Sequence, residues 1–184
     1  MKKASIFLLA LFALAAGAFA RDDYAISQIK ANFPNTPQIS FGGAPAKPFT
    51  PQTWLEVEVE FKSNVDFAEE LTFKYYIYLD VKKCLVGTVT HVNVPKGNSL
   101  FSVMYVSPGT LARLAGGKFS KNVQEVTVQI LDKGQVVAQK SMKGTPGEWW
   151  SKLDQPAGLV WNKNQTPFSS LYWDHYVEIK PSAN

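Results

Sequence analysis

Cysteine and histidine are almost missing from this 184-residue sequence, and each shortage excludes a class of protein. Cys84 is the only cysteine, so no disulfide can form within the chain, and stability must come from packing and backbone pairing. We expect Cys84 to be a small buried residue at a strand end, with an intermolecular disulfide as the alternative. His91 and His175 are the only histidines, and neither lies in a metal-ligand motif. The sequence therefore predicts no metal and no cofactor.

Long hydrophobic runs are also absent, apart from one near the N-terminus. Two lysines precede an apolar run from Ile6 to Ala16, and small residues follow as far as Ala20. This order is typical of a secretory signal peptide, and the run is shorter than the roughly twenty residues that a membrane-spanning helix needs. We therefore expect cleavage after Ala20. The mature chain is predicted to be secreted or to lie in the periplasm or cell envelope, without a membrane span.

The charge balance is mild. Two lysines leave with the signal peptide and no acidic residue does, so the formal net charge falls from +4 to +2. We therefore expect no nucleic-acid partner. The remaining 164 residues are enough for one domain with a hydrophobic core.

Catalytic motifs are not found in the sequence either. Asp174 and His175 lie close to Ser169, but neighbouring residues on a strand point to opposite faces, and there is no Gly-x-Ser-x-Gly elbow. We interpret Asp174 and His175 as surface polar groups. The row of glutamates from Glu56 to Glu60 is interpreted as a solvated strand face. The sequence therefore predicts that the protein is not an enzyme.

Alternation of apolar and polar residues is what the sequence has in abundance. It is longest in Glu70–Lys83, where one face is predicted to be core and the other carries Tyr76 and Tyr78. Other strands are predicted over residues 24–33, 53–62, 84–94, 100–106, 122–131 and 135–142. Residues 34–52 hold five of the eleven prolines, which predicts a loop or extended arm.

Turns and one short helix are expected between these strands. Polar turns are predicted around Asn64 and Gly97, and a hairpin loop around Gly134. Ser107 as a cap with Pro108 in the first position predicts one or two helical turns. About seven strands and no long helix indicate an all-β fold, a single antiparallel immunoglobulin-like β-sandwich, with a lipocalin-like barrel as the alternative.

The tail of residues 148–184 is irregular but aromatic. Four of the five tryptophans lie there: Trp149, Trp150, Trp161 and Trp173. They are predicted either to pack over an open end of the sandwich or to form an aromatic platform that binds a glycan. We therefore divide the chain into a signal peptide (1–20), an N-terminal strand with a proline-rich arm (21–52), and a sandwich domain (53–184) on which the tail packs.

A second set of side chains predicts contact with another protein molecule. Tyr76 and Tyr78 lie on the outer face of their strand, and Phe101 and Tyr105 belong to a strand that is apolar on both faces. Each also has a monomeric explanation, as a buried strand or an aromatic cross-strand pair. The sequence thus predicts a non-enzymatic binding or assembly protein with a protein partner or self-association, and a carbohydrate-binding module is the alternative.

The leader, the strand blocks 53–62 and 70–83, and the Thr-Pro-Phe and Trp-Asp-x-Tyr motifs of residues 161–176 together resemble a family of small secreted proteins from Verrucomicrobia-type bacteria. Some members have immunoglobulin-like folds and are associated with pilus-type gene clusters. The resemblance implies the same fold and an accessory role in a pilus-like surface system, and it supplies no catalytic motif. Because a type IV pilin keeps its apolar N-terminal helix and this leader is expected to be removed, a polymerising pilin of that kind is not expected.

Overall fold

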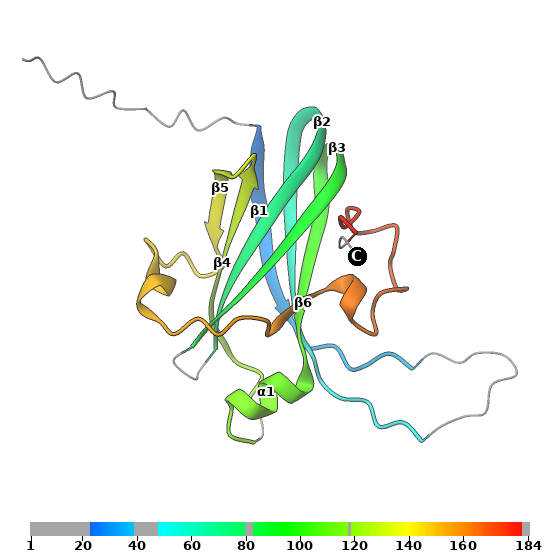
Figure 1. The fold of residues 1–184 in the computed structure, drawn as a ribbon, viewed down its shortest axis with the longest axis vertical. Helices are drawn as coiled ribbons and strands as arrows, with labels where there is room; N and C mark the ends of the chain where they lie inside the picture. The colour runs from blue at the N-terminus through cyan, green and yellow to red at the C-terminus, as the bar shows by residue number, and fades with distance from the viewer. Residues whose placement is uncertain (1–22, 39–47, 80–82, 118, 182–184) are drawn as a thin grey trace, which may run out of the picture.

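The structure is a computed structural model that describes residues 23–38, 48–79, 83–117 and 119–181 (Figure 1). The predicted signal peptide and its cleavage point lie outside these residues. No helix in the described part is long and apolar enough to cross a membrane. The elements along the described chain are β1 (Tyr24–Asn32), β2 (Leu55–Leu79), β3 (Cys84–Val106), α1 (Pro108–Leu114), β4 (Val123–Asp132), β5 (Gln135–Ser141), the 3₁₀ helix η1 (Trp149–Lys152), β6 (Val160–Asn162) and the 3₁₀ helix η2 (Lys163–Gln165).

All six described strands belong to one antiparallel sheet. The strands follow the order β5-β4-β2-β3-β6, and β1 also pairs with β2. β1 and β4 use different parts of β2, since β1 pairs with Glu56–Ser63 and β4 pairs with Thr72–Leu79. The long β2 and β3 therefore form a central ribbon whose two halves have different neighbours.

This central two-stranded ribbon folds back on itself, so that its two halves face each other. Phe61 and Phe73 are twelve residues apart in β2, which would separate them by about 40 Å in a straight strand. Their ring centroids are only 4.8 Å apart. The β2–β3 ladder shifts its register between Phe61 and Phe67, and both strands curve over at that end of the molecule (Figure 1).

The bend produces two layers. We call the layer of β1, the first half of β2, the second half of β3 and β6 the first layer, and the layer of the second half of β2, the first half of β3, β4 and β5 the second layer. The predicted all-β sandwich is confirmed. The described residues contain six strands, close to the predicted number of about seven. The predicted turns at Asn64 and Gly97 are wrong, because Ser63 pairs with Gly97 inside a ladder that continues through the bend.

The core lies between the inner faces of the two layers. Leu55, Val57, Val59 and Phe61 line it from the first layer, and Leu71, Phe73, Ile77 and Leu79 line it from the second. The alternation of these residues with polar ones is what places them on one side of each strand. The hydrophobic face predicted for Glu70–Lys83 is thus confirmed as far as Leu79, where the described part of the strand ends.

A chain of buried hydrogen bonds crosses this core. The Tyr75 hydroxyl donates to Ser102 Oγ at 2.7 Å, and Ser102 Oγ lies 2.7 Å from Nε2 of His91. Nδ1 of His91 lies 3.0 Å from the carbonyl oxygen of Val177 in the tail. Burial lowers the pKa of His91 to about 4, so the ring is neutral near pH 7. Nδ1 therefore carries the proton and donates to Val177, while Nε2 accepts from Ser102.

Two local predictions are also confirmed. α1 begins after Ser107, whose side chain accepts a hydrogen bond from the Thr110 backbone N–H at 3.2 Å. β4 and β5 form the predicted hairpin, and its loop residues Lys133 and Gly134 both have positive φ, 49° and 79°. This is the conformation that a two-residue hairpin loop requires.

The C-terminal tail wraps around the sandwich. Residues 148–155 lie on the outer face of the second layer, and β6 then pairs with the edge of β3. Residues 163–176 cover the outer face of the first layer (Figure 1). The last described residues return to β3, where the Val92 N–H donates to the Glu178 carbonyl at 2.9 Å. Both outer faces therefore carry a cover made from the same tail.

Candidate functional site

The cover of the second layer is closed. Trp150 is only 4% exposed and stacks on Tyr76, with ring centroids 4.2 Å apart. The Tyr76 hydroxyl donates to Gln129 Oε1 at 3.2 Å, and the Trp149 indole N–H donates to Thr127 Oγ1 at 2.8 Å. Tyr76 lies on the outer face of its strand, as predicted, but the chain's own tail covers that face, so Tyr76 is not exposed for contact with a partner.

Cys84 and Tyr78 belong to the same covered face. Cys84 is fully buried beside Tyr76 and Trp150, as predicted, and burial raises the pKa of its thiol to about 12. A protonated thiol is a poor nucleophile, so the expectation of a packing role for Cys84 is supported over the intermolecular disulfide. Tyr78 is half-buried and lies against Trp149 at 5.9 Å between ring centroids.

The cover of the first layer begins with a second aromatic cluster. Tyr105 is buried and stacks on Phe168 with a centroid distance of 4.8 Å and an interplanar angle of 6°. Trp54 packs edge-on against both rings. The strand over residues 100–106 is apolar on both faces because its outer side is buried under the tail. The expectation that Tyr105 contacts a partner is therefore wrong.

Two glutamates of the predicted solvated row are in fact half-buried beneath this cover. Glu56 Oε2 accepts from the Tyr105 hydroxyl at 2.9 Å, and its Oε1 accepts from Asn32 Nδ2 at 3.1 Å. Glu58 Oε2 accepts from the Tyr176 hydroxyl at 2.9 Å. Burial and the neighbouring carboxylates raise the pKa of Tyr105 and of Tyr176, so both phenols stay protonated as donors. The carboxylates thereby anchor the cover to the sheet.

Beyond these anchors the cover opens into a hollow of about 570 Å³. Its lining residues are Glu56, Glu58, Tyr172, Asp174, His175 and Tyr176. We call residues 171–176 the aromatic loop. Nε2 of His175 lies 3.6 Å from Glu58 Oε2, and the His175 ring stacks on Phe101 at 4.0 Å between centroids. The hollow thus combines carboxylate acceptors with flat rings.

The tip of the aromatic loop projects two large side chains into solvent. Tyr172 is 71% exposed and Trp173 is 78% exposed. Tyr172 also has a φ of 51°, in the left-handed region that a bulky residue rarely adopts. The ends of the loop are fixed, since Leu171 packs on the Trp54 cluster and Tyr176 is bonded to Glu58. The loop is therefore held in one shape with its rings outward.

The four tail tryptophans do not form one platform. Trp149 and Trp150 lie on the second layer, whereas Trp161 and Trp173 lie on the first-layer side. Trp161 is 36% exposed and packs edge-on against Trp54 at 6.0 Å. Trp173 of the predicted platform belongs to the loop, and Phe101 and Tyr105 of the predicted interface both contact the loop from beneath. The sequence signal that could have found the site is the dense run Tyr-Trp-Asp-His-Tyr at residues 172–176.

The side chains that line the hollow have the chemistry of a binding surface. In the described part of the chain, no group of three or more His, Cys, Asp or Glu side chains is placed to hold a metal ion. Asp174 and His175 are exposed polar groups, as predicted, and both also line the hollow. Carboxylates that accept hydrogen bonds and rings that stack on flat apolar surfaces suit a ligand with donors and an apolar face.

Comparison with known proteins gives a family and a fold. A protein-family model matches residues 16–183. A crystal structure of a protein from Akkermansia muciniphila, a verrucomicrobial bacterium, superposes with a TM-score of 0.74 at 24% sequence identity, covering 87% of this chain and 94% of that one. No curated protein matches this sequence. The resemblance to Verrucomicrobia-type proteins and the all-β sandwich are both confirmed.

Proposed function

The chain belongs to the family whose model matches residues 16–183, and from this membership we propose that it is a non-enzymatic binding or assembly protein of the cell envelope or the secreted space, an accessory of a pilus-like surface system. The resemblance to small secreted proteins of Verrucomicrobia-type bacteria, some of which are associated with pilus-type gene clusters, supports the surface system. The aromatic loop supports the binding role. The single observation that carries the proposal is the outward display of Tyr172 and Trp173 on an otherwise anchored cover.

The energetics of the loop favour a binding role over a packing role. Two adjacent exposed rings contribute little to folding, because apolar surface stabilises a protein only when it leaves water. The left-handed backbone at Tyr172 costs about 1 kcal/mol more than an ordinary conformation. Lys163 helps to hold the loop, since its Nζ donates to the carbonyl of Ser169, just before the loop, at 2.7 Å and lies 5.7 Å from the centroid of the Tyr176 ring. A preorganised display of Tyr and Trp is the arrangement that protein partners bind at low entropic cost.

The experiment measures binding of the purified protein to surface filaments prepared from the native cell. Trp173→Ala should weaken binding at least about tenfold, which corresponds to about 1.4 kcal/mol. The matched control is Phe67→Ala, because Phe67 is also exposed (57%) but lies at the bend, away from the loop. Equal binding by the wild type and both variants would contradict a role for the loop.

A carbohydrate-binding function is the second candidate, and the mixed lining of the hollow favours it. Tyr172 and Tyr176 supply flat rings, and Glu56, Glu58 and Asp174 supply acceptors for sugar hydroxyls. A panel of soluble glycans should then change the tryptophan fluorescence of the wild type but not of Trp173→Phe. Unchanged wild-type fluorescence across a broad panel would remove this candidate and leave the protein partner.

A further inference from the structure

We propose that the free edge of β1 near its C-terminal end, at residues 29–33, is a second binding site that is independent of the aromatic loop. This edge takes an extended acidic segment of a partner protein as an added β-strand. β1 pairs with β2 on one side, and no other described strand pairs with its opposite edge. β5, at the end of the second layer, lies beside this edge without joining it in a ladder. The open side of the sandwich therefore runs between β1 and β5.

A lysine closes this open side beside the N-terminal half of β1. Lys140 of β5 reaches across, and its Nζ donates to the Ser27 carbonyl at 2.6 Å. A lysine on an exposed strand edge is a common protection against unwanted pairing. Ser27 lies at the register shift of β1, so the ladder is also irregular there. This protection does not reach residues 29–33, where the chain of β1 continues past the end of β5.

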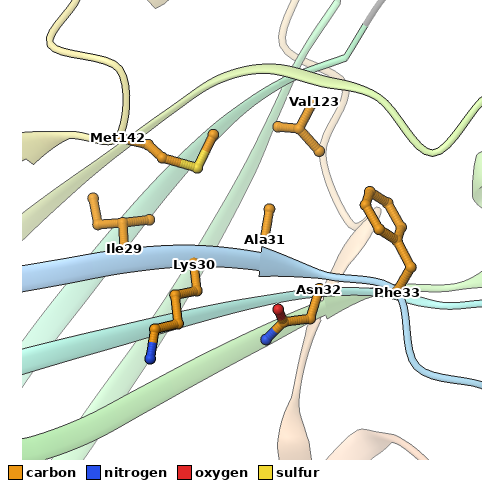
Figure 2. Close-up of a pocket in the computed structure, with 7 residues that line it drawn as sticks. All are labelled: Ile29, Lys30, Ala31, Asn32, Phe33, Val123 and Met142. Carbon is orange, nitrogen blue, oxygen red and sulfur yellow. The ribbon is translucent and has the colours of Figure 1, made fainter.

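At residues 29–33 the free edge of β1 borders a hollow of about 340 Å³ (Figure 2). Its apolar lining comes from three segments: Ile29, Ala31 and Phe33 around the end of β1, Val123 at the start of β4, and Met142 after β5. Figure 2 shows Ile29 and Ala31 on the same side of β1 as Val123 and Met142, with Lys30 and Asn32 on the other side. These apolar residues also pack in or against the main core. The floor of the hollow is thus the side of the core itself.

The backbone of β1 supplies the hydrogen-bonding groups for an added strand. The Pro34 carbonyl accepts from the Trp54 N–H at 2.9 Å, so residue 34 directs its carbonyl toward the β2 side. In an antiparallel ladder, alternate residues direct their N–H and C=O groups to opposite edges. Ala31 and Phe33 therefore present theirs on the free edge. An extended peptide is the ligand that matches such a row.

The charges around the hollow select an acidic segment. Lys30 lines it and is exposed, and Lys143 Nζ is bonded to the carbonyl of Val123 on the opposite wall at 2.8 Å. Lys140 lies beside the N-terminal half of β1. No acidic residue is among the lining residues. A strand that alternates apolar and acidic residues would place its apolar side chains in the hollow and its carboxylates on the opposite side of the added strand, the side on which Figure 2 shows Lys30.

The first test uses an eight-residue peptide of alternating valine and glutamate, with alternating valine and lysine as the charge control, and measures binding to the full protein by calorimetry. The glutamate peptide should bind at least tenfold more tightly than the lysine peptide. Lys30→Glu should reverse that preference, whereas Trp173→Ala should leave it unchanged. Failure of the wild type to bind the glutamate peptide, or equal binding of both peptides, would overturn the proposal without touching the role of the aromatic loop.

The second test asks whether the backbone edge makes the contact. Ala31→Pro removes the N–H on the free edge and not one used by β2, so binding should fall at least tenfold. Should this variant not fold, two methylated forms of the valine–glutamate peptide give the same information. One form carries N-methyl groups on its odd-numbered backbone nitrogens and the other on its even-numbered ones. One of the two forms should lose binding and the other should keep it. Equal binding by both methylated peptides would overturn strand addition. A wild-type dimer that Ala31→Pro dissociates would assign the edge to a second copy and overturn the acidic partner.

Discussion

The two outer faces of the sandwich are covered by one tail but end in different states. On the second layer, Trp150 stacks on Tyr76 and is buried, so the cover is a packed third layer. On the first layer, Phe168 is buried in the same way, yet the chain then rises into the aromatic loop and leaves Tyr172 and Trp173 in solvent. The difference teaches that aromatic residues in this tail have two uses. Those with a ring to stack on stabilise the fold, and those at the loop tip are available for a ligand.

The largest effect should come from opening the closed cover. Trp150→Ala removes a stacked ring and leaves Tyr76 and Cys84 without their neighbour, so unfolding free energy should fall by about 3–5 kcal/mol. Trp173→Ala should change it by less than about 0.5 kcal/mol. Urea unfolding measures both. Similar losses for the two variants would mean that the loop is as much a part of the fold as the closed cover.

The next effect comes from protonating His91, which holds the end of the first-layer cover through Val177. Its pKa of about 4 in the folded state lies below the unfolded value of 6.5, so the unfolded chain binds the extra proton between these values. Stability should therefore fall as the pH falls from 6.5 to 4, by about 3 kcal/mol in total. Unfolding measured at pH 4, 5, 6 and 7 checks this. His91→Gln should be less stable at pH 7 and should flatten the dependence; an unchanged slope would assign it to other groups.

A smaller effect separates hydrogen bonding from stacking in the closed cover. Tyr76→Phe keeps the ring against Trp150 but removes the hydroxyl that donates to Gln129, which should cost about 1 kcal/mol. Tyr172→Phe, at an exposed position, should cost less than about 0.3 kcal/mol. Thermal unfolding of the two variants beside the wild type gives the difference. If neither variant differs from the wild type, stacking alone seals the second layer.

The smallest effect should have the opposite sign and lies at the loop tip. Asparagine adopts the left-handed conformation more readily than tyrosine, so Tyr172→Asn should raise the unfolding free energy by about 0.5 kcal/mol. Tyr172→Val should lower it, because a branched side chain fits that conformation poorly. Filament binding by the asparagine variant should be weaker than that of the wild type. Stabilisation together with unchanged binding would restrict the binding surface to Trp173.

The sequence predicted local structure well and long-range contacts poorly. Period-two alternation located the paired parts of β2 and β3, and a cap and a glycine located α1 and the hairpin loop, because these signals act over a few residues. Alternation does not record curvature, so the polar residues near Asn64 indicated a turn where the ladder continues through a bend. The sequence therefore divided into separate strands what the described residues show as the two long strands β2 and β3.

The same limit explains the site. Alternation correctly placed Glu56, Glu58 and Tyr76 on outer faces, but it could not show that a distant tail returns to cover them. The tail has no periodicity, so its four tryptophans could be counted but not assigned to a layer. Only the composition of residues 172–176 pointed to the loop. Which side chains lie opposite the glutamates depends on tertiary packing over more than a hundred residues of chain.

The tail's position in the sequence also sets the order in which the molecule can be completed during synthesis. Trp150 and Phe168, which close the two faces, are synthesised after Tyr76 and Tyr105, the residues that they cover. Until then the emerging chain carries two uncovered aromatic surfaces, and a product that stops early keeps them. A protein truncated before Trp150 therefore displays the kind of surface that chaperones and proteases recognise.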